Sequence, residues 1–181
     1  SDDNRVRIGA EGGIGAVIAA MSHRRVSAGV EARGCGVLRL LAANAGVGGK
    51  IGQEGGIGAV LAVMKRHGEL VRVQKQGCGA LRNLAVSSDD NRVRIGAEGG
   101  IGAVIAAMSH RRVSAGVEAR GCGVLRLLAA NAGVGGKIGQ EGGIGAVLAV
   151  MKRHGELVRV QKQGCGALRN LAVSSDDNRV R

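Results

Sequence analysis

Four cysteines carry the most reactive side chains of the sequence, and they recur every 43 or 44 residues, at Cys35, Cys78, Cys122 and Cys165. A thiolate can bind a metal or attack a substrate, but zinc motifs pair cysteines two to four residues apart and a nucleophile needs an adjacent base. Neither pattern is present. Equivalent positions on packed helices lie roughly 8–10 Å apart, beyond the Cα separation of about 7 Å that a disulfide tolerates. We therefore predict reduced cysteines that act as small core residues.

The four histidines follow the same spacing, at His23, His67, His110 and His154. Each comes at the end of an apolar-periodic stretch, where a cation offsets the partial negative charge of a helix C-terminus. One histidine per repeat cannot converge on a single ion. We therefore predict solvated helix ends and no metal site.

Residues 45–51, AGVGGKI, resemble a phosphate-binding glycine-rich loop. That motif needs a glycine five residues before the Gly of its Gly-Lys pair and a Ser or Thr after the lysine. Asn44 and Ile51 occupy those two places instead. No catalytic set remains, so we expect neither an enzyme nor a cofactor.

Four arginines form another regular series, at Arg39, Arg82, Arg126 and Arg169. The planar guanidinium group of arginine binds carboxylates and phosphates well. A stripe of arginines therefore has three possible interpretations: a solvated face, a site for an acidic peptide or a site for nucleic acid. Single-stranded nucleic acid generally stacks on aromatic side chains. The chain has no Phe, Trp or Tyr, which argues against nucleic acid.

These series are regular because the sequence is a repeat. Residues 1–87 and 88–174 are identical at every position, and residues 175–181 begin a third copy. Within each copy a fainter repeat of about 43 residues divides the chain into two types of module. We therefore expect one domain of four stacked modules, at residues 1–43, 44–87, 88–130 and 131–174, with a partial fifth at 175–181.

Composition narrows the class of protein further. The 181 residues include 34 glycines and no proline, and their net charge is +12, whereas average usage is about 7% Gly and about 5% Pro. Together with the verbatim duplication, this bias favours a designed or recombined sequence over a recent natural tandem duplication. There is no run of 18 apolar residues and no charged-then-apolar leader, so we expect a cytoplasmic protein that does not enter a membrane.

Apolar periodicity predicts three helices in each module and no strands. In the first module, Ser1 caps a short helix over residues 4–11, which the glycine pair at 12–13 ends. A second helix follows, and the longest helix spans residues 28–44. The first helix of the second module is expected to be frayed or reduced to a turn, because its glycines each cost about 1 kcal/mol relative to alanine.

A helical projection divides the long helix of the first module into two faces. The broad apolar face, which we expect to be buried, contains Val30, Gly34, Cys35, Val37, Leu38, Leu41 and Ala42. The opposite side contains Arg33, Gly36, Arg39 and Leu40. The stripe of arginines is therefore expected on the side of the long helices that faces away from the core.

Three segments carry a resemblance to the armadillo repeat family: NRVRI at residues 91–95, GGI at 99–101 and GCGALRNLA at 77–85. The resemblance implies a right-handed α-solenoid of four armadillo-type three-helix repeats whose third helices line a concave groove for extended peptides. The asparagine that holds a peptide backbone in this family corresponds to Asn83 and Asn170, and to Leu40 and Leu127 in the other modules. The family's groove tryptophans correspond to Gly36, Gly79, Gly123 and Gly166.

The two ends of the predicted stack have ordinary modules rather than polar caps, which solenoids usually carry. A second copy of the chain is therefore expected to dock head to tail, in a contact that closes into a ring or continues as a filament. The residues expected at this contact are Ile8, Ile14, Ile18, Val160, Leu168 and Leu171. We thus expect a self-associating structural scaffold, and the alternative is a groove that holds an acidic peptide.

Overall fold

The computed structural model describes residues 1–23, 26–110, 114–175 and 178–179, which form twelve α-helices and no strand. In residues 1–87 the helices are α1 (Asp2–Ala10), α2 (Gly13–Ser22), α3 (Ala28–Leu41), α4 (Ala45–Gln53), α5 (Gly56–Arg66) and α6 (Val71–Ser87). In the second copy they are α7 (Asp89–Ala97), α8 (Gly100–Ser109), α9 (Ala115–Leu128), α10 (Ala132–Gln140), α11 (Gly143–Arg153) and α12 (Val158–Ser174). The all-helical prediction is confirmed.

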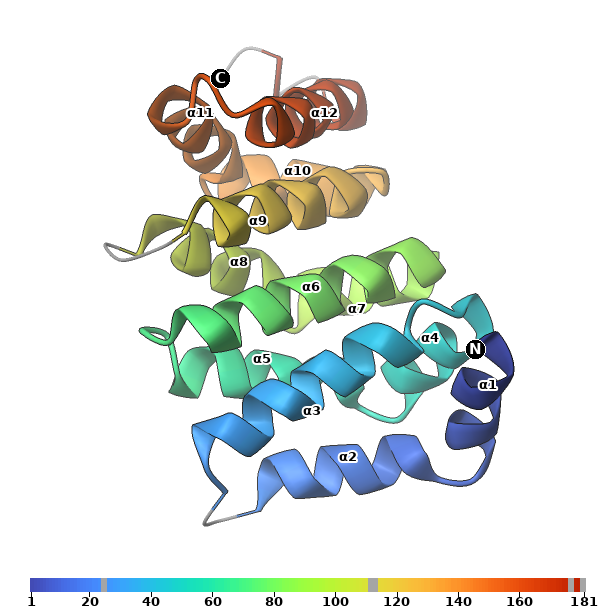
Figure 1. The fold of residues 1–181 in the computed structure, drawn as a ribbon. Coiled ribbons are helices and arrows are strands. Elements are labelled where there is room, and N and C mark those ends of the chain that lie inside the picture. Colours follow the sequence, from blue (N-terminus) through green and yellow to red (C-terminus); the bar gives the residue numbers. More distant parts are fainter. Residues whose placement is uncertain (24–25, 111–113, 176–177, 180–181) are drawn as a thin grey trace.

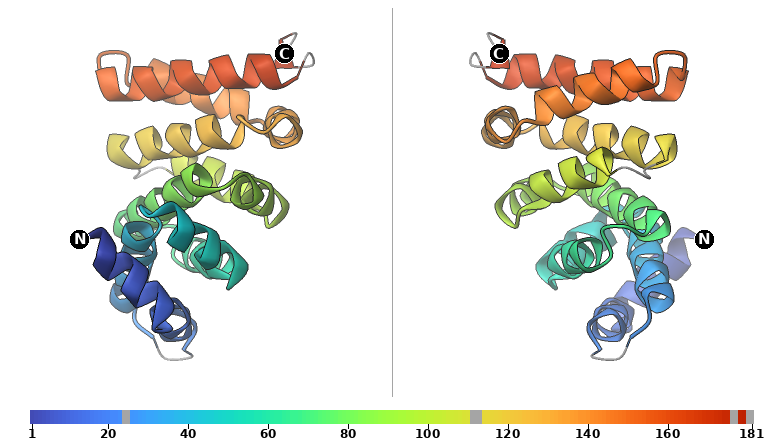
Figure 2. Two further views of the ribbon diagram at one scale, coloured as in Figure 1. Left: turned by 90° about the vertical axis from the view of Figure 1, so that its right-hand side faces the viewer. Right: turned by 90° about the vertical axis from the view of Figure 1, so that its left-hand side faces the viewer.

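The helices form four successive layers of three (Figure 1). The long helices α3, α6, α9 and α12 pack against one another in that order, and the shorter helices α2, α5, α8 and α11 do the same behind them. Figure 2 shows that the long helices turn progressively along the stack. An interior layer is therefore covered on both sides, whereas the first and last layers are each covered on one side.

Side-chain caps and glycine pairs set where the short helices begin and end. The Asn44 side chain accepts a hydrogen bond from the backbone N–H of Val47 at 3.0 Å, which starts α4. Between α1 and α2, Gly12 has a φ of 83°, a left-handed conformation that glycine adopts most readily. A Cβ at Gly13 would lie only 2.7 Å from the backbone oxygen of Ile8. The first glycine therefore makes the turn, and the second allows the two helices to approach closely.

The prediction that the first helix of the second module is frayed or a turn is wrong, because α4 and its copy α10 are helices over nine residues each. Their glycines are close contact points: a Cβ at Gly52 would overlap the side chain of Asn91. Asn91 Nδ2 donates to the backbone oxygens of Gly48 at 3.0 Å and Leu84 at 3.1 Å. This packing offsets the low helix propensity of glycine.

Two helix boundaries also differ from the prediction. Helix α1 begins at Asp2 and ends at Ala10, rather than spanning residues 4–11. Helix α3 ends at Leu41 instead of continuing to Asn44, because Asn44 is in an extended conformation as the cap of α4.

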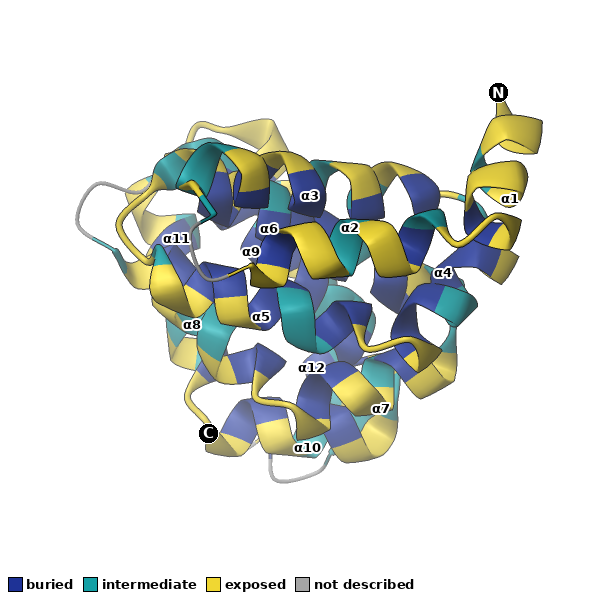
Figure 3. Cartoon of the chain, turned by 90° about the horizontal axis from the view of Figure 1, so that it is seen from below, coloured by how far each residue is buried: buried dark blue, intermediate teal, exposed yellow. Residues whose placement is uncertain are grey.

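The predicted buried face of the first long helix is only partly buried. Cys35 and Leu38 are fully buried, but Val30 and Val37 are 40% and 36% exposed. Their identical counterparts 87 residues later, Val117 and Val124, are both 0% exposed. The difference arises because α6 covers this side of α9, whereas no described helix covers it on α3 (Figure 3).

Candidate functional site

The four predicted arginines lie along the row of long helices, but they do not share one environment. Arg39, Arg82 and Arg126 are half-buried, and Arg169 is exposed. Arg39 Nε donates to Gln76 Oε1 at 3.1 Å, and Arg126 Nε donates to Gln163 Oε1 at 3.2 Å. The arginines of the first and third layers therefore link their long helix to the next one.

The two predicted groove asparagines also make contacts between helices. Asn83 Nδ2 donates to the backbone oxygen of Arg39 at 2.8 Å, and Asn170 Nδ2 donates to that of Arg126 at 2.8 Å. These carbonyls belong to the last turn of α3 and α9, where a helix leaves its own acceptors unpaired. In the other layers the corresponding Leu40 is 51% exposed and Leu127 is half-buried.

Glycines at the positions of the family's tryptophans give the arginines room. A Cβ at Gly79 would lie 2.6 Å from Cδ of Arg39, and one at Gly166 would lie 2.5 Å from Cδ of Arg126. The arginine side chain therefore crosses the next long helix where a larger residue would block it.

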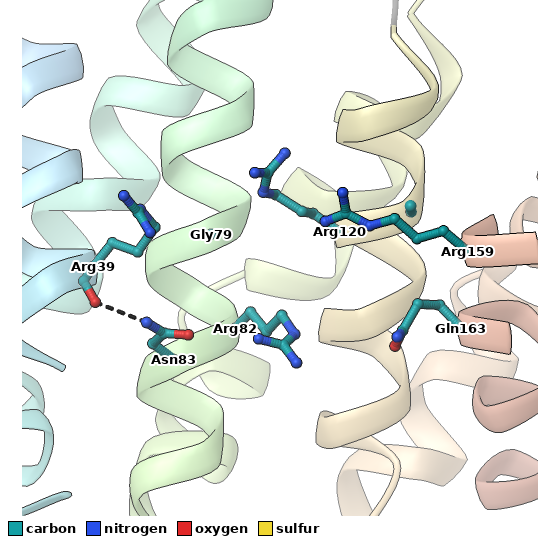
Figure 4. A pocket seen from close by; sticks show the side chains of 8 residues that line it. Arg39, Gly79, Arg82, Asn83, Arg120, Arg159 and Gln163 are labelled. Atoms are coloured by element: carbon teal, nitrogen blue, oxygen red, sulfur yellow. Dashed lines mark hydrogen bonds between the residues drawn. The ribbon is translucent and has the colours of Figure 1, made fainter. Parts of the chain in front are cut away.

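A cavity of about 330 Å³ opens between the long helices and is walled mainly by arginine (Figure 4). Arg82 extends from α6 toward α9, Arg120 extends from α9 toward α6, and Arg159 reaches from α12 toward Arg120. Arg39 and the neutral side chains of Asn83 and Gln163 also line it. We call this cavity the arginine pocket.

Two residues of the arginine pocket, Arg120 and Arg159, were absent from the predicted site. Neither residue is part of the 43-residue arginine series, and the two lie on different helices. The pocket combines residues from all four layers. The only sequence signal was the placement of Arg33, the identical counterpart of Arg120, on the side of the long helix that faces away from the core. The packing of α9 between α6 and α12, which a repeat spacing does not reveal, places these side chains at one cavity.

Buried carboxylates lie between the first and second layers and between the third and fourth. Glu31 is 0% exposed and contacts both Arg66 and His67 of the next layer. The identical Glu118 contacts Arg153, and its Oε2 lies 2.6 Å from His154 Nε2. The prediction of merely solvated histidines is therefore wrong for His67 and His154, because a ring nitrogen of each contacts a buried carboxyl group from the preceding layer.

Three of the four cysteines are buried as predicted, and one is not. Burial raises the pKa of the Cys78 thiol to about 12, and burial together with the negative charge of Glu31 raises the pKa of Cys35 to about 12. Burial and Glu118 raise the pKa of Cys122 in the same way, to about 12. Cys165 is exposed, because no further layer covers α12 as α9 covers α6.

The residues predicted at the ends of the stack divide into two groups. Ile14, Val160 and Leu171 are buried within the chain itself. Ile8 is 43% exposed, and Ile18 and Leu168 are half-buried. The buried three are enclosed by the chain itself, so their side chains are not available for contact with a second copy.

Comparison with the interior copy shows which residues the ends leave uncovered. The N-terminal face consists of residues that are exposed or half-buried while their identical counterparts are buried, and it includes Ile8, Val17, Ala20, Val30 and Val37. The C-terminal face, defined in the same way, includes Ile144, Leu148, Met151, Cys165 and Leu168. Both faces are mainly aliphatic.

The described fold and site define an all-helical protein built from repeated triplets of helices. It is similar to the crystal structure of an engineered protein from the Northeast Structural Genomics Consortium, with a TM-score of 0.86 and 19% sequence identity over 97% of this chain and 68% of that chain. No family model matches the sequence, and no curated protein is similar to it.

The described residues form neither a metal-binding cluster nor a membrane-spanning helix. Among them, no three His, Cys, Asp or Glu side chains gather where they could hold a metal ion. None of the described helices has the length and apolar character needed to span a membrane.

Proposed function

We propose that the chain is an engineered structural scaffold, a right-handed α-solenoid of armadillo-type repeats without catalytic activity, and that copies of it associate head to tail. The verbatim duplication and the similarity to an engineered protein support the scaffold role. The observation that supports association is that the two exposed end faces have the same sequences as the two surfaces that already pack together inside the chain.

That internal contact joins the second and third layers, where α6 packs against α9 and α7. The C-terminal face has the sequence of the surface that the third layer covers, and the N-terminal face has the sequence of the surface that covers it. Leu81 is 0% exposed in the internal contact, and its counterpart Leu168 is half-buried. A second copy can therefore repeat a packing arrangement that the sequence already satisfies.

The chain's last residues compete with an incoming copy for part of this contact. Asn178 is buried and donates through Nδ2 to the backbone oxygens of Gly135 at 3.2 Å and Leu171 at 3.0 Å. Asn91 makes the equivalent bonds inside the chain, whereas Asn4 is exposed. Because Asn178 takes the place that Asn4 of a docking copy needs, removal of residues 175–181 is expected to strengthen association several-fold.

Sedimentation equilibrium from low to high micromolar concentration tests the proposal. The chain should show mass above the monomer, and Ile8→Lys should abolish it by placing a charge in the apolar contact. Val93→Lys is the matched control, because Val93 is 48% exposed on an interior layer. A chain that stays monomeric throughout, or equal effects of the two variants, contradicts head-to-tail association.

The alternative function is a groove for an acidic peptide, which the half-buried arginines of the long helices favour. The hydrogen bonds of Asn83 and Asn170 to neighbouring helices count against it, because one amide donor of each is already used. Fluorescence anisotropy of a labelled Glu/Asp-rich peptide at moderate salt distinguishes the two functions. Saturable binding supports the groove, and no response removes it.

A further inference from the structure

The arginine pocket concentrates positive charge with no opposite charge among its lining residues. Its other polar side chains, Asn83 and Gln163, are neutral. Among the described residues, none of Arg39, Arg82, Arg120 and Arg159 makes an ion pair. Four cations from four different helices therefore face one cavity.

The surroundings of Arg120 show what this arrangement costs. Burial lowers the pKa of the Arg120 guanidinium, and the positive charges of Arg159, Arg39 and Arg82 lower it further. Like charges at close range in a partly buried site repel one another more strongly than in water. An anion between them would replace this repulsion with attraction and charge-assisted hydrogen bonds.

We propose that the arginine pocket binds a small polyanion with two or more linked phosphate groups, of the pyrophosphate and triphosphate class. Its volume of about 330 Å³ is at the lower end of small-ligand pockets, which span roughly 300–1,000 Å³. Arginine forks donate pairwise to phosphate oxygens, and four of them around one cavity suit a compact multivalent anion. Gly79 and Ala119 add no side-chain bulk beyond a methyl group to its walls.

The same pocket recurs at the proposed contact between copies, and this second step rests on the proposed function. The identical counterparts of Arg39 and Arg82 are Arg126 and Arg169, and those of Arg120 and Arg159 are Arg33 and Arg72. If a second copy docks as the third layer docks on the second, Arg126 and Arg169 of one copy lie beside Arg33 and Arg72 of the next copy. A polyanion bound there would strengthen assembly.

Isothermal titration calorimetry with inorganic triphosphate tests the internal pocket in the Ile8→Lys background, which removes assembly. One site per chain is expected, and Arg120→Gln should weaken binding at least tenfold. Arg33→Gln is the matched control, because it removes the same charge from the same local sequence outside the pocket, and it should change affinity less than twofold. The melting temperature of Arg120→Gln should change little, since relief of the repulsion offsets the loss of the hydrogen bond that Arg120 donates to the backbone oxygen of Gly116 at 3.1 Å.

Three outcomes overturn the proposal that the arginine pocket binds a polyanion. Absence of binding does so, and so does an equal loss in Arg120→Gln and Arg33→Gln, because that result indicates diffuse attraction to a basic chain. Tighter binding of hexaglutamate than of triphosphate assigns the pocket to a peptide instead. Triphosphate binding by a parent chain that does not assemble leaves the pocket intact and removes only head-to-tail association, so the two proposals fail separately.

Discussion

The chain contains two copies of one 87-residue sequence in different surroundings, and the difference between them isolates the effect of a neighbouring layer. Ile95 is fully buried, whereas the identical Ile8 is 43% exposed. Cys78 is fully buried, whereas the identical Cys165 is exposed. Because residue type and local sequence are the same, contact with a neighbouring layer accounts for the difference: the preceding layer covers Ile95, and the following layer covers Cys78. Burial in this molecule is therefore a property of the stack rather than of a single module.

The largest expected effect is on thiol reactivity. At pH 8 a thiol with a pKa of about 12 is ionised in about one molecule in ten thousand, and the thiolate is the reactive form. In dilute native protein, Cys165 should react with a maleimide at least about a thousand times faster than Cys78. Mass spectrometry of the labelled peptides measures both rates. Rapid labelling of Cys78 would contradict the claim that the neighbouring layer buries it.

Substitution by lysine should separate the copies in stability. Ile95→Lys places a charge in a fully buried site and should lower the free energy of unfolding by at least about 3 kcal/mol. Ile8→Lys should lower it by less than about 1 kcal/mol, because the lysine can reach water. Urea unfolding of dilute protein by circular dichroism gives both values, and similar losses would show that the N-terminal face is covered.

For the buried carboxylates we expect equal losses of stability in the two copies, because Glu31 and Glu118 are both 0% exposed and have equivalent partners. Glu31→Gln and Glu118→Gln should each cost about 2 kcal/mol, the loss of charge-assisted hydrogen bonds. The two losses should agree because both sites lie under a covering layer. If urea unfolding gives losses that differ by more than about 1 kcal/mol, position in the stack affects stability through more than direct contact with a neighbouring layer.

The smallest effect is a loss of stability in alkali. Folding raises the pKa of the buried thiols from 9.0 to about 12. Their contribution to the free energy of unfolding is therefore constant below pH 9 and falls as the pH rises toward 12. At pH 10 the loss is about 1.4 kcal/mol per thiol. Cys78→Ala should reduce the decline between pH 8 and pH 10 by about that amount, and Cys165→Ala should not change it.

The sequence predicted the features that depend on local pattern. The repeat, the helix triplets, the glycine breaks and the burial of Cys35 and Cys78 all follow from periodicity and residue type. The sequence missed what depends on neighbours across layers. Helix α4 is stabilised by close contact with Asn91, which propensity alone does not include. Arg120 and Arg159 line one cavity because α9 and α12 pack side by side.

The position of Cys165 offers the most direct test of the central claim that each end presents half of the internal contact. Docking of a second copy should bury Cys165 as Cys78 is buried, so its labelling rate should fall at least tenfold between low and high micromolar chain concentrations. In Ile8→Lys the rate should stay fast at every concentration. A Cys165 rate that does not depend on concentration in the parent chain would contradict the account.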